Sequence, residues 1–282
     1  MTKKNEALSE LIKNATAGDS KSLETLICSV QDLVFNLSLR MLGTFADAED
    51  ATQDILLKII THLSSFKEES SFSTWVFRIA LNHLKNYRKH MFAHHPLSFE
   101  FYGDDIKNGK IHDVPDLTQN VEKAVLAEEL KMSCTNVMLQ CLDTESRCIF
   151  ILGTMFQADS RIAGEILGMT PEAYRQRLSR IRKKMADFLQ EYCGEYGYGT
   201  CRCKDRVNYA IQNHRINPAH LDYTEAALIP EQTMLDVKKA MEKIDDLSQH
   251  FLFIKTYAAP QQTAQFIKDF LDSASFSVVK NA

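Results

Sequence analysis

The sequence lacks a long hydrophobic run. Its longest apolar stretch, residues 149–156 with Gly153 and Thr154 included, is far shorter than the roughly 20 residues that cross a bilayer. Lys3 and Lys4 are followed by a polar, helix-like segment where a secretory signal would have an apolar core. We therefore expect a protein without membrane insertion that works in the cytoplasm.

Glycine, proline and cysteine are scarce, with ten, six and seven residues among 282. Seven scattered cysteines are too few for a disulfide scaffold, so in a reducing compartment we expect thiols or metal ligands. Neither sign of charge predominates, because the chain has 33 Lys and Arg residues and 37 Asp and Glu residues, which gives a net charge of −4. That balance argues against indiscriminate nucleic-acid binding but allows basic patches on single domains.

Helical periodicity runs through most of the chain, with no internal repeat and no alternation long enough for a sheet core. We predict an all-α fold of two small helical domains, the second a helix-turn-helix, joined by a flexible linker and followed by a mostly helical C-terminal extension. Proline, glycine and the absence of a sustained helical stripe mark the linker. The predicted ranges are 1–92 and 121–192 for the domains, 93–120 for the linker and 193–282 for the extension, with extension helices near 231–254 and 263–271.

The first informative segment, 46–63, predicts an amphipathic helix. Asp47, Asp50 and Asp54 recur at spacings of three and four, opposite an apolar stripe that includes Ile55 and Ile59. These carboxylates could simply complement the helix dipole and be solvated, which periodicity favours. They could also form a docking surface for a basic partner.

The second segment, 71–90, contains the single tryptophan of the chain. Its predicted buried stripe is Val76, Ile79, Ala80, His83 and Tyr87. Aromatic, amide and cationic side chains share the neighbouring faces, a mixture that suits single-stranded nucleic acid because bases stack on rings while amides bind base edges. Composition does not separate this interpretation from a core tryptophan with solubilising cations.

The third segment, 160–189, has the pattern of a helix-turn-helix. A short helix ends at Gly168, and Thr170 and Pro171 then supply the N-cap and first position of a second helix. The second helix has six Arg and Lys residues between 175 and 184 and no acid among them. Such a helix fits the major groove of DNA, although similar spacing also occurs in proteins that bind no DNA.

Taken in order, these segments resemble bacterial RNA polymerase sigma factors of the sigma-70 superfamily, extracytoplasmic-function (ECF) type. The sequence DAEDATQDILLKI is similar to the polymerase-binding motif of that family, and STWVFRIALNHLKNYRK to its promoter-melting and −10 recognition segment. IAGEILGMTPEAYRQRLSRIRKKM is similar to its −35-reading helix-turn-helix. The likeness covers about residues 5–192.

The resemblance implies a role for each segment, residue by residue. The clamp helices of the largest polymerase subunit would face Asp47, Glu49, Asp50, Gln53 and Asp54. The −10 element would be contacted by Trp75, Arg78, Asn82, Lys85, Asn86, Arg88 and Lys89. The −35 element and its phosphates would be contacted by Arg175, Gln176, Arg177, Ser179, Arg180, Lys183 and Lys184.

By this resemblance the protein is a transcription initiation factor that binds core RNA polymerase, directs it to promoter DNA and helps to melt the −10 element. Polymerisation chemistry belongs to the polymerase, so we expect neither an enzyme nor a required cofactor. An anti-sigma factor, or the extension itself, would regulate it. The alternatives are a helix-turn-helix regulator that acts without polymerase and an adaptor that binds polymerase but does not read promoters.

The extension contains a cysteine cluster. Cys193, Cys201 and Cys203, with His214 further along, form a candidate zinc site of three thiols and one imidazole. A thiol redox switch is an alternative, because neighbouring Arg and Lys residues would lower thiol pKa values. Structural cysteines without a ligand are the third possibility.

Overall fold

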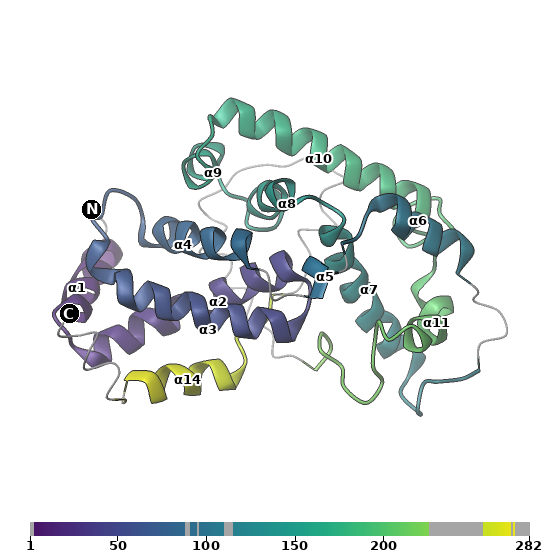
Figure 1. The fold of residues 1–282 in the computed structure, drawn as a ribbon, viewed down its shortest axis with the longest axis horizontal. Coiled ribbons are helices and arrows are strands. Elements are labelled where there is room, and N and C mark those ends of the chain that lie inside the picture. The colour runs from purple at the N-terminus through teal and green to yellow at the C-terminus, as the bar shows by residue number, and fades with distance from the viewer. Residues whose placement is uncertain are drawn as a thin grey trace.

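The computed structural model describes residues 3–87, 91–94, 96–109, 115–225, 256–271 and 273. Within these ranges the regular elements are helices, apart from two isolated β-bridges (Figure 1), which confirms the predicted all-α fold. The helices of the N-terminal half and the segment after it are α1 (Lys3–Thr16), α2 (Ser20–Leu42), α3 (Phe45–His62), η1 (Leu63–Ser65), α4 (Phe72–Asn86), α5 (Met91–His94) and α6 (Phe99–Asn108). Those that follow are α7 (Lys123–Gln140), α8 (Thr144–Phe150), η2 (Ile151–Met155), α9 (Ser160–Leu167), α10 (Pro171–Tyr192), η3 (Cys203–Arg206), α11 (Val207–Gln212) and α14 (Gln261–Leu271).

Helix α2 is the central helix of the N-terminal half, with α1, α3 and α4 packed around it. The Asp19 carboxylate caps its first turn by accepting a hydrogen bond from the Ser22 amide at 2.8 Å. The helix ends at Gly43, whose φ of +92° is left-handed. Among the described helices, α2 is the one long and apolar enough to cross a membrane, but most of it is buried inside the protein, as in the core helix of a soluble domain.

Helices α7 to α10 form the second half of the fold. Asp143 caps α8 by accepting a hydrogen bond from the Ser146 amide at 2.8 Å, and α8 continues into the π-helical turn η2. Gly153 in this turn allows α10 to approach, because a Cβ at that position would overlap Leu178. The helix end predicted at Gly168 is confirmed.

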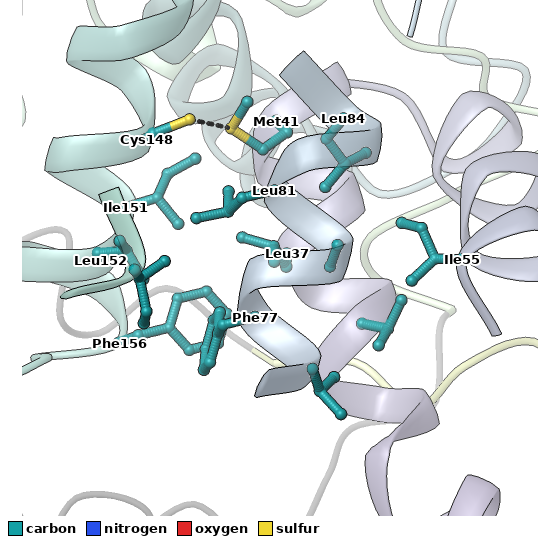
Figure 2. Packing of buried hydrophobic residues seen from close by; sticks show 14 of the residues in the cluster. Leu37, Met41, Ile55, Phe77, Leu81, Leu84, Cys148, Ile151, Leu152 and Phe156 are labelled. Atoms are coloured by element: carbon teal, nitrogen blue, oxygen red, sulfur yellow. Dashed lines mark hydrogen bonds between the residues drawn. The ribbon is translucent and has the colours of Figure 1, made fainter. Parts of the chain in front are cut away.

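A single hydrophobic core joins the two halves (Figure 2). Leu37 of α2 and Leu81 of α4 face Ile151 and Leu152 of η2 across this core. The predicted boundaries between 1–92, 93–120 and 121–192 remain predictions about folding units. In the structure, the helices of the first and third ranges bury their apolar faces against each other.

The segment predicted as a linker contains a helix that the sequence analysis missed. Ser98 caps α6 by accepting a hydrogen bond from the Phe101 amide at 3.1 Å. Phe99 and Tyr102 then pack against Phe188 of α10, with ring centroids 5.1 and 5.7 Å away. The helix is ten residues long, so its apolar stripe spans only two turns. Its glycine and acidic residues made the segment resemble a loop in the sequence.

The first part of the extension packs against α6. Asp105 of α6 accepts hydrogen bonds from both guanidinium nitrogens of Arg215, at 2.6 and 2.7 Å, and from the Tyr209 hydroxyl at 2.7 Å. Burial raises the pKa of the Asp105 carboxyl, but these hydrogen bonds outweigh it and hold the pKa below its usual value. Arg206 donates to the Ile106 carbonyl at 2.8 Å. The extension is therefore part of the folded body.

Helix α14 lies along α2 and α3 (Figure 1). It confirms the helix predicted near 263–271, and it begins two residues earlier. The helix predicted near 231–254 lies outside the described residues.

Arg147 fastens α8 to the end of α2 and the end of α7. Its guanidinium is buried and donates to four backbone carbonyls, those of Met41, Leu139, Gln140 and Leu142, at 2.6, 2.8, 3.3 and 2.9 Å. Burial lowers the pKa of Arg147 to about 10, so the side chain stays charged at neutral pH.

We expect Arg147→Met to lower the free energy of unfolding by about 3 kcal/mol, because four buried carbonyls lose their donor. Urea unfolding followed by circular dichroism measures the change. The control is Arg161→Met, since the Arg161 side chain is 86% exposed and its loss costs less than about 0.5 kcal/mol. Equal effects of the two substitutions would contradict this interpretation of Arg147.

Candidate nucleic-acid interface

The acidic face predicted for 46–63 lies on α3. Thr44 caps this helix: its hydroxyl accepts a hydrogen bond from the Asp47 amide at 3.2 Å and donates to the Asp47 carboxylate at 2.6 Å. Asp50 is exposed, and Glu49 beside it is half-buried. Burial, together with the charge of Asp50, raises the pKa of Glu49. The remaining predicted residues of the face, Asp47, Gln53 and Asp54, are half-buried.

Helix α4 lies next to this acidic face. The imidazole Nε2 of His83 is 3.7 Å from a carboxylate oxygen of Asp54. Burial raises the pKa of Tyr87, and the nearby charges of Asp50 and Asp54 raise it further. The acidic face and the C-terminal half of α4 therefore form one continuous polar region.

The predicted buried stripe of α4 is partly wrong. Val76, Ala80 and Tyr87 are buried as predicted, but Ile79 and His83 are only half-buried. The stripe is also wider than predicted, because α4 packs against α2 and α3 on one side and against α8 and α9 on the other. The buried residues that the sequence analysis missed are Phe72, Thr74, Phe77, Leu81 and Leu84.

The described side chains predicted to contact the −10 element line the outer face of α4. Asn82 and Asn86 are exposed one turn apart, and the side-chain amide of Asn86 donates to the backbone carbonyl of Asn82 at 2.9 Å. Trp75 is half-buried, with Phe66 and Phe72 at centroid distances of 5.4 and 5.7 Å. Lys85 and Arg78 are half-buried, and Arg88 and Lys89 lie outside the described residues.

Helices α9 and α10 form the predicted helix-turn-helix. Gly168 ends α9 with a φ of +69°, and the Thr170 hydroxyl caps α10 by accepting from the Ala173 amide at 3.2 Å. Gly164 allows the tight turn, because a Cβ there would lie 2.6 Å from the Met169 carbonyl oxygen. The sequence pattern therefore identified the turn and both of its caps.

The predicted −35 residues lie on the outer face of α10. Those that are exposed are Arg175, Gln176, Ser179, Arg180, Lys183 and Lys184. Arg177 is half-buried and forms a bidentate ion pair with Glu145, in which its two terminal nitrogens lie 2.6 and 2.7 Å from the carboxylate oxygens. Arg182, which was counted with the basic residues of this helix, donates instead to the Gly153 carbonyl at 2.8 Å and the Thr154 hydroxyl at 3.1 Å.

The three cysteines of the predicted zinc site are held by a tight loop. Cys193 and Cys201 pair as an isolated parallel bridge, in which the Gly194 amide donates to the Cys201 carbonyl at 2.9 Å. A Cβ at Gly199 would overlap the backbone of Tyr192, so only glycine permits this return of the chain.

A fourth thiol, Cys134 of α7, lies near this loop. Burial, together with the neighbouring Cys134, Cys201, Glu195 and Cys193, raises the pKa of Cys203 to about 12. His214, the predicted imidazole ligand, is exposed after α11. The described residues contain no group of three or more His, Cys, Asp or Glu side chains arranged to hold a metal ion, so the zinc site with Cys193, Cys201, Cys203 and His214 stays a prediction.

Two of the remaining cysteines belong to the core, whereas Cys28 of α2 is exposed. Cys141 and Cys148 are buried, and the Cys134 thiol receives a hydrogen bond from the Tyr102 hydroxyl at 3.0 Å. Burial raises the pKa of Cys134 and of Cys141 to about 12 and that of Cys148 to about 11.

These pKa values predict slow alkylation in the folded protein. The thiolate is the reacting form, so at pH 8 iodoacetamide should modify the exposed Cys28 well before Cys134, Cys141 or Cys148. Peptide mass spectrometry after timed quenching measures the order, and denaturation in urea should abolish the difference. Alkylation of Cys134 as fast as Cys28 in the native protein would contradict the burial described above.

Comparison with known proteins gives the family. Residues 26–90 match the family described as Sigma-70 region 2. The ECF RNA polymerase sigma-E factor of Escherichia coli is 30% identical over 180 residues, which cover 64% of this chain and 93% of that protein. The ECF RNA polymerase sigma factor SigW of Bacillus subtilis is 26% identical over 180 residues, which cover 64% of this chain and 95% of that protein.

A solved structure, that of CnrH in complex with the cytosolic domain of CnrY, matches 64% of this chain and 94% of that chain, with 22% identity and a TM-score of 0.46. The sequence matches place the protein in the sigma-70 class of transcription factors. Within that class, the chain belongs to the ECF family of RNA polymerase sigma factors. The matched 64% leaves about a third of the chain without a counterpart in these relatives.

Proposed function

We propose that this sigma factor binds core RNA polymerase, directs it to specific promoters and helps to open the −10 element. The observation that supports this most is the arrangement of polar faces on α3, α4 and α10. Each is the outer side of a helix whose other side is buried in one common core. The role needs no catalytic group of its own, and it places the protein in the cytoplasm with the polymerase and the promoter.

Core binding is proposed for the acidic face of α3. Its carboxylates lie on a rigid helix with a capped first turn, so their spacing is fixed before the partner arrives. Charge complementarity of this kind speeds association and selects the partner.

Promoter opening is proposed for α4. Unstacking a base from the duplex costs a few kcal/mol, which contacts to the extruded base must repay. Asn82 and Asn86 offer exposed amides, and Trp75 on the same helix is half-buried. The amides can bind base edges while Lys85 neutralises a phosphate.

Recognition of the −35 element is proposed for α10. Arg175, Gln176 and Arg180 are exposed near its N-terminal end, the part of a recognition helix that meets base edges in the major groove. Lys183 follows on the same side and would contact a phosphate. Arg177 would have to release Glu145 before it could contact DNA.

We expect Asp50→Lys to weaken binding to core RNA polymerase at least tenfold, because it reverses the most exposed charge of the acidic face. Fluorescence titration of labelled core measures the affinity, and run-off transcription measures the consequence. Glu10→Lys is the matched control, since Glu10 is an exposed acid on α1 outside this face. Equal loss in the two variants would show that net charge, not the acidic face, governs binding.

Arg180→Ala in the holoenzyme should weaken promoter binding by about 1–3 kcal/mol and reduce selectivity for the −35 sequence. Footprinting on promoters with intact and scrambled −35 elements measures both effects. Lys204→Ala, an exposed cation in the extension, is the control and should leave both unchanged. Tight binding of the promoter by the free protein, without polymerase, would instead support a helix-turn-helix regulator.

A further inference from the structure

Two tyrosines of the extension are buried between the two halves of the sigma factor. Tyr223 and Tyr257 pack with Phe35 and Leu39 of α2 and with Met132 of α7 in a separate hydrophobic cluster. Tyr257 is fully buried and Tyr223 is 6% exposed. Burial of two aromatic rings is a large apolar contribution for a segment that lies beyond the resemblance to ECF sigma factors at about residues 5–192.

A polar network runs through the same cluster. Asn136 of α7, which is fully buried, accepts a hydrogen bond from Arg40 of α2 at 2.8 Å and donates to the Tyr223 hydroxyl at 2.9 Å. The Tyr223 hydroxyl in turn donates to the Gly43 carbonyl at 3.4 Å. One side chain of the extension is therefore bound to both halves.

Separate anchors fix each tyrosine. The buried Glu129 carboxylate of α7 accepts from the backbone amide of Tyr223, at 3.0 Å, and from the amide and hydroxyl of Thr224, at 2.9 and 3.0 Å. The Asn36 side chain of α2 donates to the Tyr257 carbonyl at 2.7 Å and accepts from its amide at 3.0 Å. Asp32, one turn earlier, accepts from the Ala259 amide at 2.8 Å.

Two surfaces proposed to bind promoter DNA, the outer face of α4 for the −10 element and the helix-turn-helix of α9 and α10 for the −35 element, lie close together in this arrangement. We call them the two reading surfaces. Helix α4 packs against α9, Phe77 and Phe156 have ring centroids 5.2 Å apart, and Arg78 pairs with Glu165 of the helix-turn-helix. The −10 and −35 elements are separated by about 25 base pairs, or about 85 Å of B-form DNA. Helices in direct contact cannot span that distance, so this closed state cannot bind both elements at once.

We propose that the extension is an intramolecular clasp that holds the sigma factor in this closed, inactive state until polymerase draws the two halves apart. The clasp comprises Tyr223, Tyr257 and their anchors Asn36, Glu129 and Asn136. The proposal rests on the proposed function, because the distance between the reading surfaces matters only at a promoter. When only a fraction of the molecules is in the conformation that can bind, the apparent affinity for the partner is reduced by that fraction.

Two Tyr→Phe substitutions in the clasp are expected to act in opposite directions. Tyr223→Phe removes the partner of the buried Asn136 amide and should raise the open population about tenfold. Tyr257→Phe removes a buried hydroxyl that has no hydrogen-bond partner among the described residues, so it should favour the closed state. Both variants keep the aromatic packing, and they differ in volume from the native chain by one oxygen each.

Run-off transcription at limiting sigma factor and excess core polymerase measures the outcome. Tyr223→Phe should raise the yield several-fold and Tyr257→Phe should lower it, while Tyr198→Phe, at a 91% exposed position, should do nothing. Equal yields from all variants, or a fall with Tyr223→Phe, would overturn the clasp and leave the proposed function standing. Absence of transcripts from every protein, with core binding intact, would count against the proposed function instead.

Small-angle scattering of the free full-length chain gives a second, independent test. A closed body of this length has a radius of gyration of about 19 Å. The double variant Asn36→Ala, Glu129→Ala should increase it by several ångströms with unchanged helical circular dichroism, whereas Asn213→Ala should not. A native chain that is already extended in solution would contradict the proposal.

Discussion

A largely buried polar stripe on α2 constrains the whole structure. Asp32, Asn36 and Arg40 recur every four residues on one side of a helix that is otherwise embedded in the core, and Asn36 and Arg40 are buried while Asp32 is half-buried. Buried polar groups are costly unless they are hydrogen-bonded, so this side of α2 must be covered by partners of matching chemistry. The backbone at 257–259 supplies them for Asp32 and Asn36, and α7 supplies one for Arg40. Removing the extension would leave Asp32 and Asn36 without those partners.

The same packing relates three surfaces for which different partners are proposed. The acidic face of α3, the amide face of α4 and the basic face of α10 are each rigid because the opposite sides of their helices share one core. In the closed state α4 lies against the helix-turn-helix, which suits a factor that must not read DNA on its own. In the proposed clasp mechanism, opening would exchange contacts between the halves for contacts with polymerase and promoter. The binding energy of those partners then sets the open population.

Local sequence signals predicted most of the fold, and tertiary partners determined the rest. The caps Asp19, Thr170 and Gly168 are short-range features, so the helices they begin and end were predictable. The shared core was not predictable, because an apolar stripe on one helix does not indicate which other helix packs against it. Helix α6 was missed because its apolar stripe spans only two turns. The approach of Cys134 to the cysteine loop was missed because nothing in the sequence of α7 indicates a contact with a loop sixty residues later. The burial of Glu129 and Asn136 was not predictable either, because their partners lie in the extension and in α2, far away in the sequence.

The proposed function requires this chain to open promoter DNA only together with core polymerase. Permanganate reactivity of thymines across a promoter, in the presence of the full-length protein, core polymerase, or both, measures this opening. Reactive, single-stranded thymines are expected at the −10 element only when both are present. Reactivity with polymerase absent, or a stable complex that stays double-stranded at −10, would contradict the proposed function.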